Sequence, residues 1–149
     1  MATPDQPDPA RSLASRLNGW GLSPLPPMGL ATLITSLHFR PFHKLPMLVF
    51  TPMLLLSSYL SVAGLKIDAA GLSAAWSGLY VLLAARRRPG GAALTSLRQR
   101  FTARGAVRGA AMGLGAVNAV GGGYAYTVGD REAERAERKE RDRWGIEKQ

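Results

Sequence analysis

The chain has no cysteine, which excludes disulfides, zinc sites built on cysteine and iron–sulfur clusters held by thiolates. It also has almost no acid before its C-terminal tail, because Asp68 is the one carboxylate between residues 9 and 129. The two histidines, His38 and His43, therefore have no acid nearby in sequence to complete a divalent-metal site or a catalytic triad. The sequence predicts no metal ligands and no catalytic residues.

The motifs of nucleotide and cofactor binding are missing as well. Gly113 and Gly115 begin a GxGxxG pattern, but Asn118 stands where the third glycine belongs. Neither GxxxxGK[ST] nor GxSxG occurs anywhere in the chain. We therefore predict that the protein is not an enzyme, binds no cofactor and takes no small-molecule substrate.

What the sequence does contain is a long apolar run, residues 45–65, in which 21 consecutive positions carry no charge. At about 1.5 Å per residue, a helix of this length spans roughly 32 Å, close to the bilayer core of about 30 Å. A helix of a small soluble domain rarely stays uncharged on every face for so long. The run predicts an all-α membrane protein.

Further apolar segments predict three to four hydrophobic helices in all. Residues 69–85 and 109–128 are long enough to span a membrane, whereas 28–39 is too short to span alone. We expect 28–39 to be inserted in the membrane, as an interfacial helix or a broken first span. Three prolines just before it should end one helix and start the next.

The segments 45–65 and 69–85 are separated by only a few residues, which predicts a tight helical hairpin. Gly64 suits the C-terminus of the first helix, and Asp68 suits the N-cap of the second. The two helices should therefore be antiparallel neighbours.

Charge is distributed unevenly along the chain, whose net charge is +9 and whose pI is about 10.8. Residues before Asp130 include twelve Lys or Arg and three Asp, and the tail after them holds seven charges of each sign. Basic loops beside apolar spans are the usual orientation signal of membrane proteins, so this pattern favours a membrane protein over a nucleic-acid binder. The loop 86–108, with seven arginines, is predicted on the matrix side if the membrane is the mitochondrial inner one.

The chain divides into three segments by composition. These are a polar N-terminal segment (1–24), a transmembrane helical domain (25–129) and a charged helical tail (130–149). In the tail, Glu134–Arg138 and Glu137–Arg141 are helix-stabilising pairs with the acid leading. The tail is predicted as a solvated helix that leaves the membrane, or one that lies along a charged neighbour.

Two sets of residues are candidate contact sites. Gly105, Gly109 and Gly113 recur at four-residue spacing, which favours close approach of another helix, although a glycine-rich composition alone also produces such spacing. The run Arg86, Arg87 and Arg88 is suited to acidic phospholipid head groups such as those of cardiolipin, or serves only to orient the chain.

The segment AGLSAAWSGLY at 70–80, followed by the arginine run and by Asn118-Ala-Val, resembles the fungal mitochondrial altered-inheritance-of-mitochondria protein nineteen family. NUXM-like accessory subunits of respiratory complex I look related to that family. The resemblance covers roughly residues 25–125 and brings no catalytic residues. It implies helix-packing or lipid-interface roles for Trp76, Ser77, Tyr80 and Asn118.

The resemblance implies a multi-pass protein of the mitochondrial inner membrane. We expect a non-catalytic accessory subunit of complex I, the NADH:ubiquinone oxidoreductase, in contact with membrane-arm subunits and phospholipid. The alternatives are an inner-membrane assembly factor and a small membrane carrier that is not permanently bound to complex I.

Overall fold

The computed structural model describes residues 9–39, 44–86 and 102–146, which form helices and no strand. These helices are α1 (Pro9–Leu22), α2 (Leu25–His38), α3 (Lys44–Val62), α4 (Lys66–Arg86), α6 (Ala103–Val128) and α7 (Arg131–Ile146). The all-helical prediction is thus confirmed for the described part of the chain.

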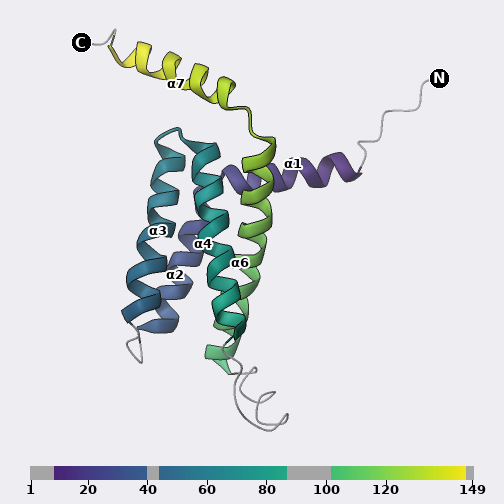
Figure 1. Cartoon of the computed structure of the whole chain (residues 1–149), viewed down its shortest axis with the longest axis vertical. Helices are drawn as coiled ribbons and strands as arrows, with labels where there is room; N and C mark the ends of the chain where they lie inside the picture. Colours follow the sequence, from purple (N-terminus) through teal and green to yellow (C-terminus); the bar gives the residue numbers. More distant parts are fainter. Residues whose placement is uncertain (1–8, 40–43, 87–101, 147–149) are drawn as a thin grey trace, which may run out of the picture.

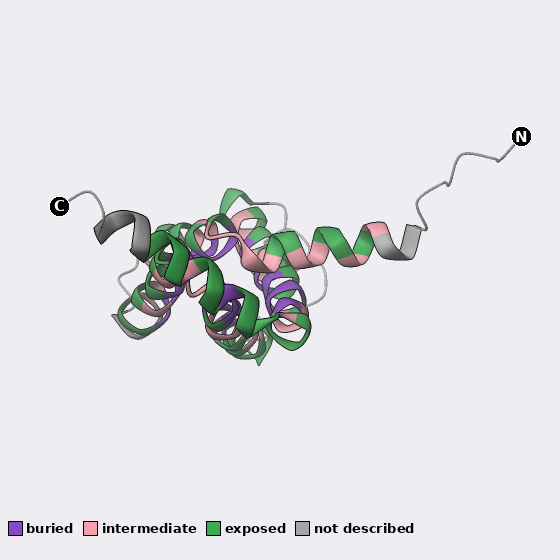
Figure 2. Ribbon diagram, turned by 90° about the horizontal axis from the view of Figure 1, so that it is seen from above, coloured by how far each residue is buried: buried purple, intermediate pink, exposed green. Residues whose placement is uncertain are grey.

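Four of these helices, α2, α3, α4 and α6, run side by side and form a bundle (Figure 1). The pairs α4–α6, α2–α3 and α3–α4 are in extensive contact, and α2 also packs on α6. Helices α1 and α7 do not follow the bundle axis. Seen from above, α7 crosses the end of the bundle and α1 extends to one side (Figure 2).

The corner between α1 and α2 lies at the prolines, which were expected to end one helix and start the next. Pro26 and Pro27 occupy the first positions of α2, where the missing N–H groups are not needed. Two serines of α3 supply donors to this corner: Ser61 Oγ donates to the Leu22 carbonyl at 2.8 Å, and Ser58 Oγ to the Pro24 carbonyl at 3.0 Å. The break is therefore tied to the bundle by side-chain hydrogen bonds.

The hairpin between α3 and α4 is as tight as the sequence predicts. Gly64 has a φ of 93°, and the amide of Leu65 donates to the carbonyl of Leu60 at 2.9 Å, as in a Schellman motif. The predicted N-cap was wrong, because α4 begins at Lys66 and Asp68 lies inside its first turn. The capping acceptor comes instead from α7, as described below.

The interior of the bundle is small and centred on Phe50 of α3. Its ring meets those of Trp76 and Tyr80, each at a centroid distance of 5.7 Å and edge to face. Leu30 and Ile34 of α2 are fully buried against the same cluster. The short segment 28–39 is thus part of α2 and contributes to the core.

Small polar side chains are buried in the bundle beside its apolar core, while many large apolar side chains lie on its outside. The fully or nearly buried polar side chains in the bundle are those of Ser57, Ser58, Ser61, Ser73, Ser77 and Asn118. Large apolar side chains face outward on α3, α4 and α6, among them Leu48, Leu55, Val62, Leu82 and Val120. Exposed apolar patches are a common feature of surfaces that contact another protein or a membrane.

Among the described residues, α4 is the one helix long and apolar enough to span a membrane. Only 33% of its most apolar window is buried in the chain, whereas the core helix of a soluble protein is mostly buried. The apolar part of α3, Met47–Val62, is shorter than that of α4. The predicted spans 45–65, 69–85 and 109–128 correspond to α3, α4 and α6, but the number of membrane crossings stays a prediction.

Helices α4 and α6 approach closely because α6 presents glycine at the contact. A Cβ on Gly122 would lie 2.6 Å from the carbonyl oxygen of Ala70, so no larger residue fits without movement. A Cβ on Gly113, which is turned away from this contact, would meet no atom of the described chain within 4 Å.

The two glycines therefore predict opposite effects for the same substitution. We expect Gly122→Ala to destabilise the fold by about 1–3 kcal/mol through overpacking. We expect Gly113→Ala to raise stability by about 0.5–1 kcal/mol, because alanine is the better helix former. Thermal unfolding in mild detergent, followed by circular dichroism, measures both, and equal shifts would contradict this account of the α4–α6 contact.

Candidate interaction surfaces

The three residues of α4 singled out in the sequence all face the bundle. Tyr80 is 5% exposed and Trp76 is half-buried, and both pack on Phe50. Ser77 is fully buried, and its hydroxyl has no hydrogen-bond partner among the described residues. All three side chains therefore make contacts within the chain.

Asn118 of α6 is 2% exposed and receives a hydrogen bond from α1. The indole Nε1 of Trp20 donates to Asn118 Oδ1 at 3.0 Å, while the amide nitrogen of Asn118 has no partner in the described part of the chain. Next to this bond, a Cβ on Gly21 would come within 2.3 Å of the Gly121 carbonyl oxygen, so the backbones of α1 and α6 nearly touch. A glycine pair and an Asn–Trp bond thus hold α1 against α6.

The glycines of α6 separate into two faces. Gly115, Gly121 and Gly122 are buried and close to α4 or α1. Gly109 and Gly113 are exposed, and a Cβ added to either would have no described atom within 4 Å, while Gly105 is half-buried. The predicted contact face of Gly105, Gly109 and Gly113 is therefore turned mainly away from the rest of the described chain.

The predicted arginine run is described only at its first member. Arg86 is exposed in the last turn of α4, while Arg87, Arg88 and most of the loop 86–108 lie outside the described residues. Nearby, Arg108 of α6 donates from its guanidinium to the carbonyl of Ala84 at 2.9 Å. This bond satisfies a carbonyl at the C-terminal end of α4, where positive charge is favourable.

Helix α7 is tied to the start of α4 by a buried acid. Glu134 Oε1 accepts a hydrogen bond from the backbone amide of Ile67 at 2.9 Å, which is the contact that a capping side chain makes. Lys66 and Glu137 form an exposed ion pair at 3.3 Å, and Glu137 is also 3.6 Å from Arg141. Apart from Glu134 and the half-buried Arg138, the described side chains of α7 are exposed, so the choice between a solvated tail and one lying along a charged neighbour stays a prediction.

Sequence reasoning missed Glu134 and the Gly21–Gly121 contact. The tail holds seven acids of similar setting, and nothing local separates Glu134 from the other six. The partner Ile67 lies 67 positions away. Gly21 could have been noticed, because it follows an aromatic residue, Trp20, in an otherwise helical stretch, and a glycine there can mark a close contact between helices.

No group of three or more His, Asp or Glu side chains that could hold a metal ion occurs within the described ranges. Comparison with models of known protein families, with curated proteins and with solved structures gives no significant match.

The bond between Trp20 and Asn118 predicts a coupled loss of stability. Trp20→Phe removes the donor and leaves the buried amide without its hydrogen bond, so we expect a loss of about 1–3 kcal/mol. In an Asn118→Leu background, Trp20→Phe should lower the free energy of unfolding by clearly less, because no buried acceptor is then left without a donor. Unfolding free energies in detergent give the double-mutant cycle, and strictly additive losses would contradict the coupling.

The capping contact of Glu134 predicts a local effect at the start of α4. Glu134→Ala should cost about 0.5–2 kcal/mol, the usual effect of losing a cap, and Glu134→Gln should cost less because it keeps an acceptor. Hydrogen exchange followed by mass spectrometry should show faster exchange around Ile67. Glu140→Ala, an exposed change on the same helix, is the control and should leave this exchange rate unaltered.

Proposed function

We propose that the protein is a multi-pass protein of the mitochondrial inner membrane and a non-catalytic accessory subunit of respiratory complex I. The observation that carries the membrane part is the number of large apolar side chains on the outside of the bundle, while serines and Asn118 are buried inside it together with an apolar core. In water this arrangement exposes apolar surface and buries polar groups, both at a cost. In a bilayer the outward leucines and valines contact lipid tails, and the buried serines Ser57, Ser58 and Ser61 bond to backbone carbonyls.

The proposal takes α3, α4 and α6 as membrane-crossing helices and α2 as a shorter inserted one. The hydroxyls of Ser57, Ser58 and Ser61 donate to carbonyls of other segments, which is how polar side chains join helices in membranes. Basic residues at one end of the bundle support a matrix-side location for the loop 86–108. We propose that the run of Arg86, Arg87 and Arg88 binds acidic phospholipid such as cardiolipin.

The subunit role is supported by the outward face of α6. This helix already has one face packed on α4 and α1, so the exposed glycines Gly109 and Gly113 are not needed for that packing. Glycine in such a position lets the backbone of a second helix approach closely, and membrane-arm subunits of complex I are the partners we propose. The resemblance of residues 70–80 to NUXM-like subunits directs the choice of complex.

The test is a native gel of mitochondrial extract in mild detergent, with peptide mass spectrometry along the lane. We expect the chain to migrate with mature complex I that oxidises NADH, in stoichiometric amount. The double variant Gly109→Leu/Gly113→Leu should release it, because the added side chains hold the partner helix away from the α6 backbone.

The matched control is Ala85→Leu, which adds a similar side chain at an exposed position of α4. It should leave co-migration intact. Migration of the unaltered chain only in small assemblies, or alone, would contradict the subunit role and favour the assembly factor or the carrier. Retention of the double variant on complex I would contradict the glycine face as the contact.

A further inference from the structure

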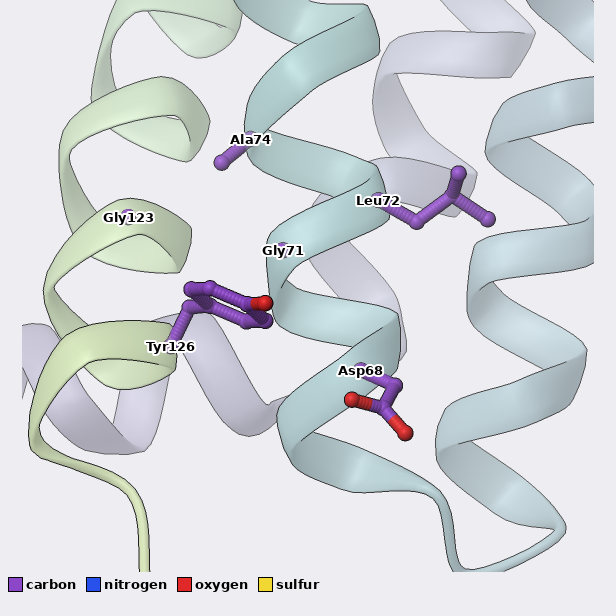
Figure 3. Close-up of a pocket in the computed structure, with 6 residues that line it drawn as sticks. All are labelled: Asp68, Gly71, Leu72, Ala74, Gly123 and Tyr126. Carbon is purple, nitrogen blue, oxygen red and sulfur yellow. The ribbon is translucent and has the colours of Figure 1, made fainter.

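A groove runs along the outer face of the bundle between α4 and α6 (Figure 3). Its volume is about 390 Å³. It is lined by Asp68, Gly71, Leu72, Ala74, Gly123 and Tyr126.

Small residues form the floor of this groove, and one aromatic ring forms its end. The ring of Tyr126 reaches from α6 to α4 and lies over Gly71, where a Cβ would meet it at 2.5 Å (Figure 3). Beyond the ring, a Cβ on Gly123 would meet nothing of the described ranges within 4 Å, so the groove is open there. The result is a shallow apolar channel that starts at a tyrosine.

Two opposite charges lie at the tyrosine end. The guanidinium of Arg131 sits 4.8 Å from the centroid of the Tyr126 ring, and its Nε is 4.0 Å from Asp68 Oδ1. The two side chains are 46% and 59% exposed. A pair this long and this exposed is weak, so both groups remain able to bind charges from outside.

The groove also has a direction along the bundle. Asp68 is in the first turn of α4 and Tyr126 is near the end of α6, so the charges mark the end of the bundle that α7 crosses. Ala74 and Gly123 lie further toward the middle. With α4 and α6 across a bilayer, the charges are at the level of the lipid head groups and the channel runs into the acyl layer.

We propose that this groove binds a phospholipid whose head group carries a primary amine, as phosphatidylethanolamine does. Its phosphate pairs with Arg131, its ammonium group pairs with Asp68, and one acyl chain lies beyond the Tyr126 ring, beside Ala74 and Gly123. An arginine guanidinium can donate two hydrogen bonds to a pair of phosphate oxygens, and a carboxylate accepts hydrogen bonds from an ammonium group. The inference rests on the membrane location proposed above, but not on the attachment to complex I.

The charges at the end of the groove favour a lipid over a helix. The separate positive and negative groups at one end match a head group that bears both charges.

Native mass spectrometry of the purified full chain in mild detergent tests the site. The chain is titrated with phosphatidylethanolamine, phosphatidylcholine and phosphatidylglycerol that have the same acyl chains. We expect the ethanolamine lipid to bind about fivefold more tightly than the others, because choline lacks N–H donors and glycerol lacks the positive charge.

Three variants separate the parts of the site. Gly123→Leu fills the groove and should lower ethanolamine-lipid binding about fivefold, whereas Gly19→Leu, at an open and exposed position of α1, should not. Asp68→Asn should remove the preference for the ethanolamine lipid. Arg131→Gln should weaken the binding of all three lipids equally.

Equal binding of the three lipids, or equal lipid binding by Gly123→Leu and Gly19→Leu, would overturn the proposal. Liposome flotation of the same preparations tests the membrane location separately. A chain that floats yet shows no lipid preference overturns this site and leaves the proposed function standing.

Discussion

The close approach of α4 and α6 is the constraint on which the rest of the structure depends. At Gly122 the α6 backbone lies against the carbonyl of Ala70, and at Gly115 it lies against Val81, so the helices meet along much of their length. This contact fixes where α6 ends, and therefore where α7 begins. Only from that position does Glu134 reach the amide of Ile67 at the start of α4.

The same contact divides α6 into two functional halves around its circumference. The inward half holds α4 and α1 through glycines and Asn118, while the outward half carries Gly109 and Gly113 with nothing of the described chain upon them. A helix that used all its glycines internally would offer no close-approach surface to a neighbour. The division lets one helix stabilise the bundle and still present a backbone-accessible face.

Much of the fold could be predicted from the sequence, because the prolines before α2 and the glycine at position 64 act within a few residues. Which side of α6 packs against the other helices could not be predicted in this way. In a soluble helix the polar side marks the outside, but α6 is apolar or small on nearly every side. The cap of α4 was also out of reach, since Asp68 has the right residue type but Glu134 from a distant helix makes the contact. Asp68 is thereby left beside Arg131 at the open end of the α4–α6 groove.

The hydrogen bonds at the α1–α2 corner explain how an irregular stretch of backbone is accommodated among apolar helices. A backbone carbonyl at an interrupted stretch that is closed off from water needs a donor from the protein. Ser58 and Ser61, one turn apart on α3, donate to Pro24 and Leu22 at this corner. These two serines tie a chain broken by prolines to the bundle, and this contact accounts for their inward position.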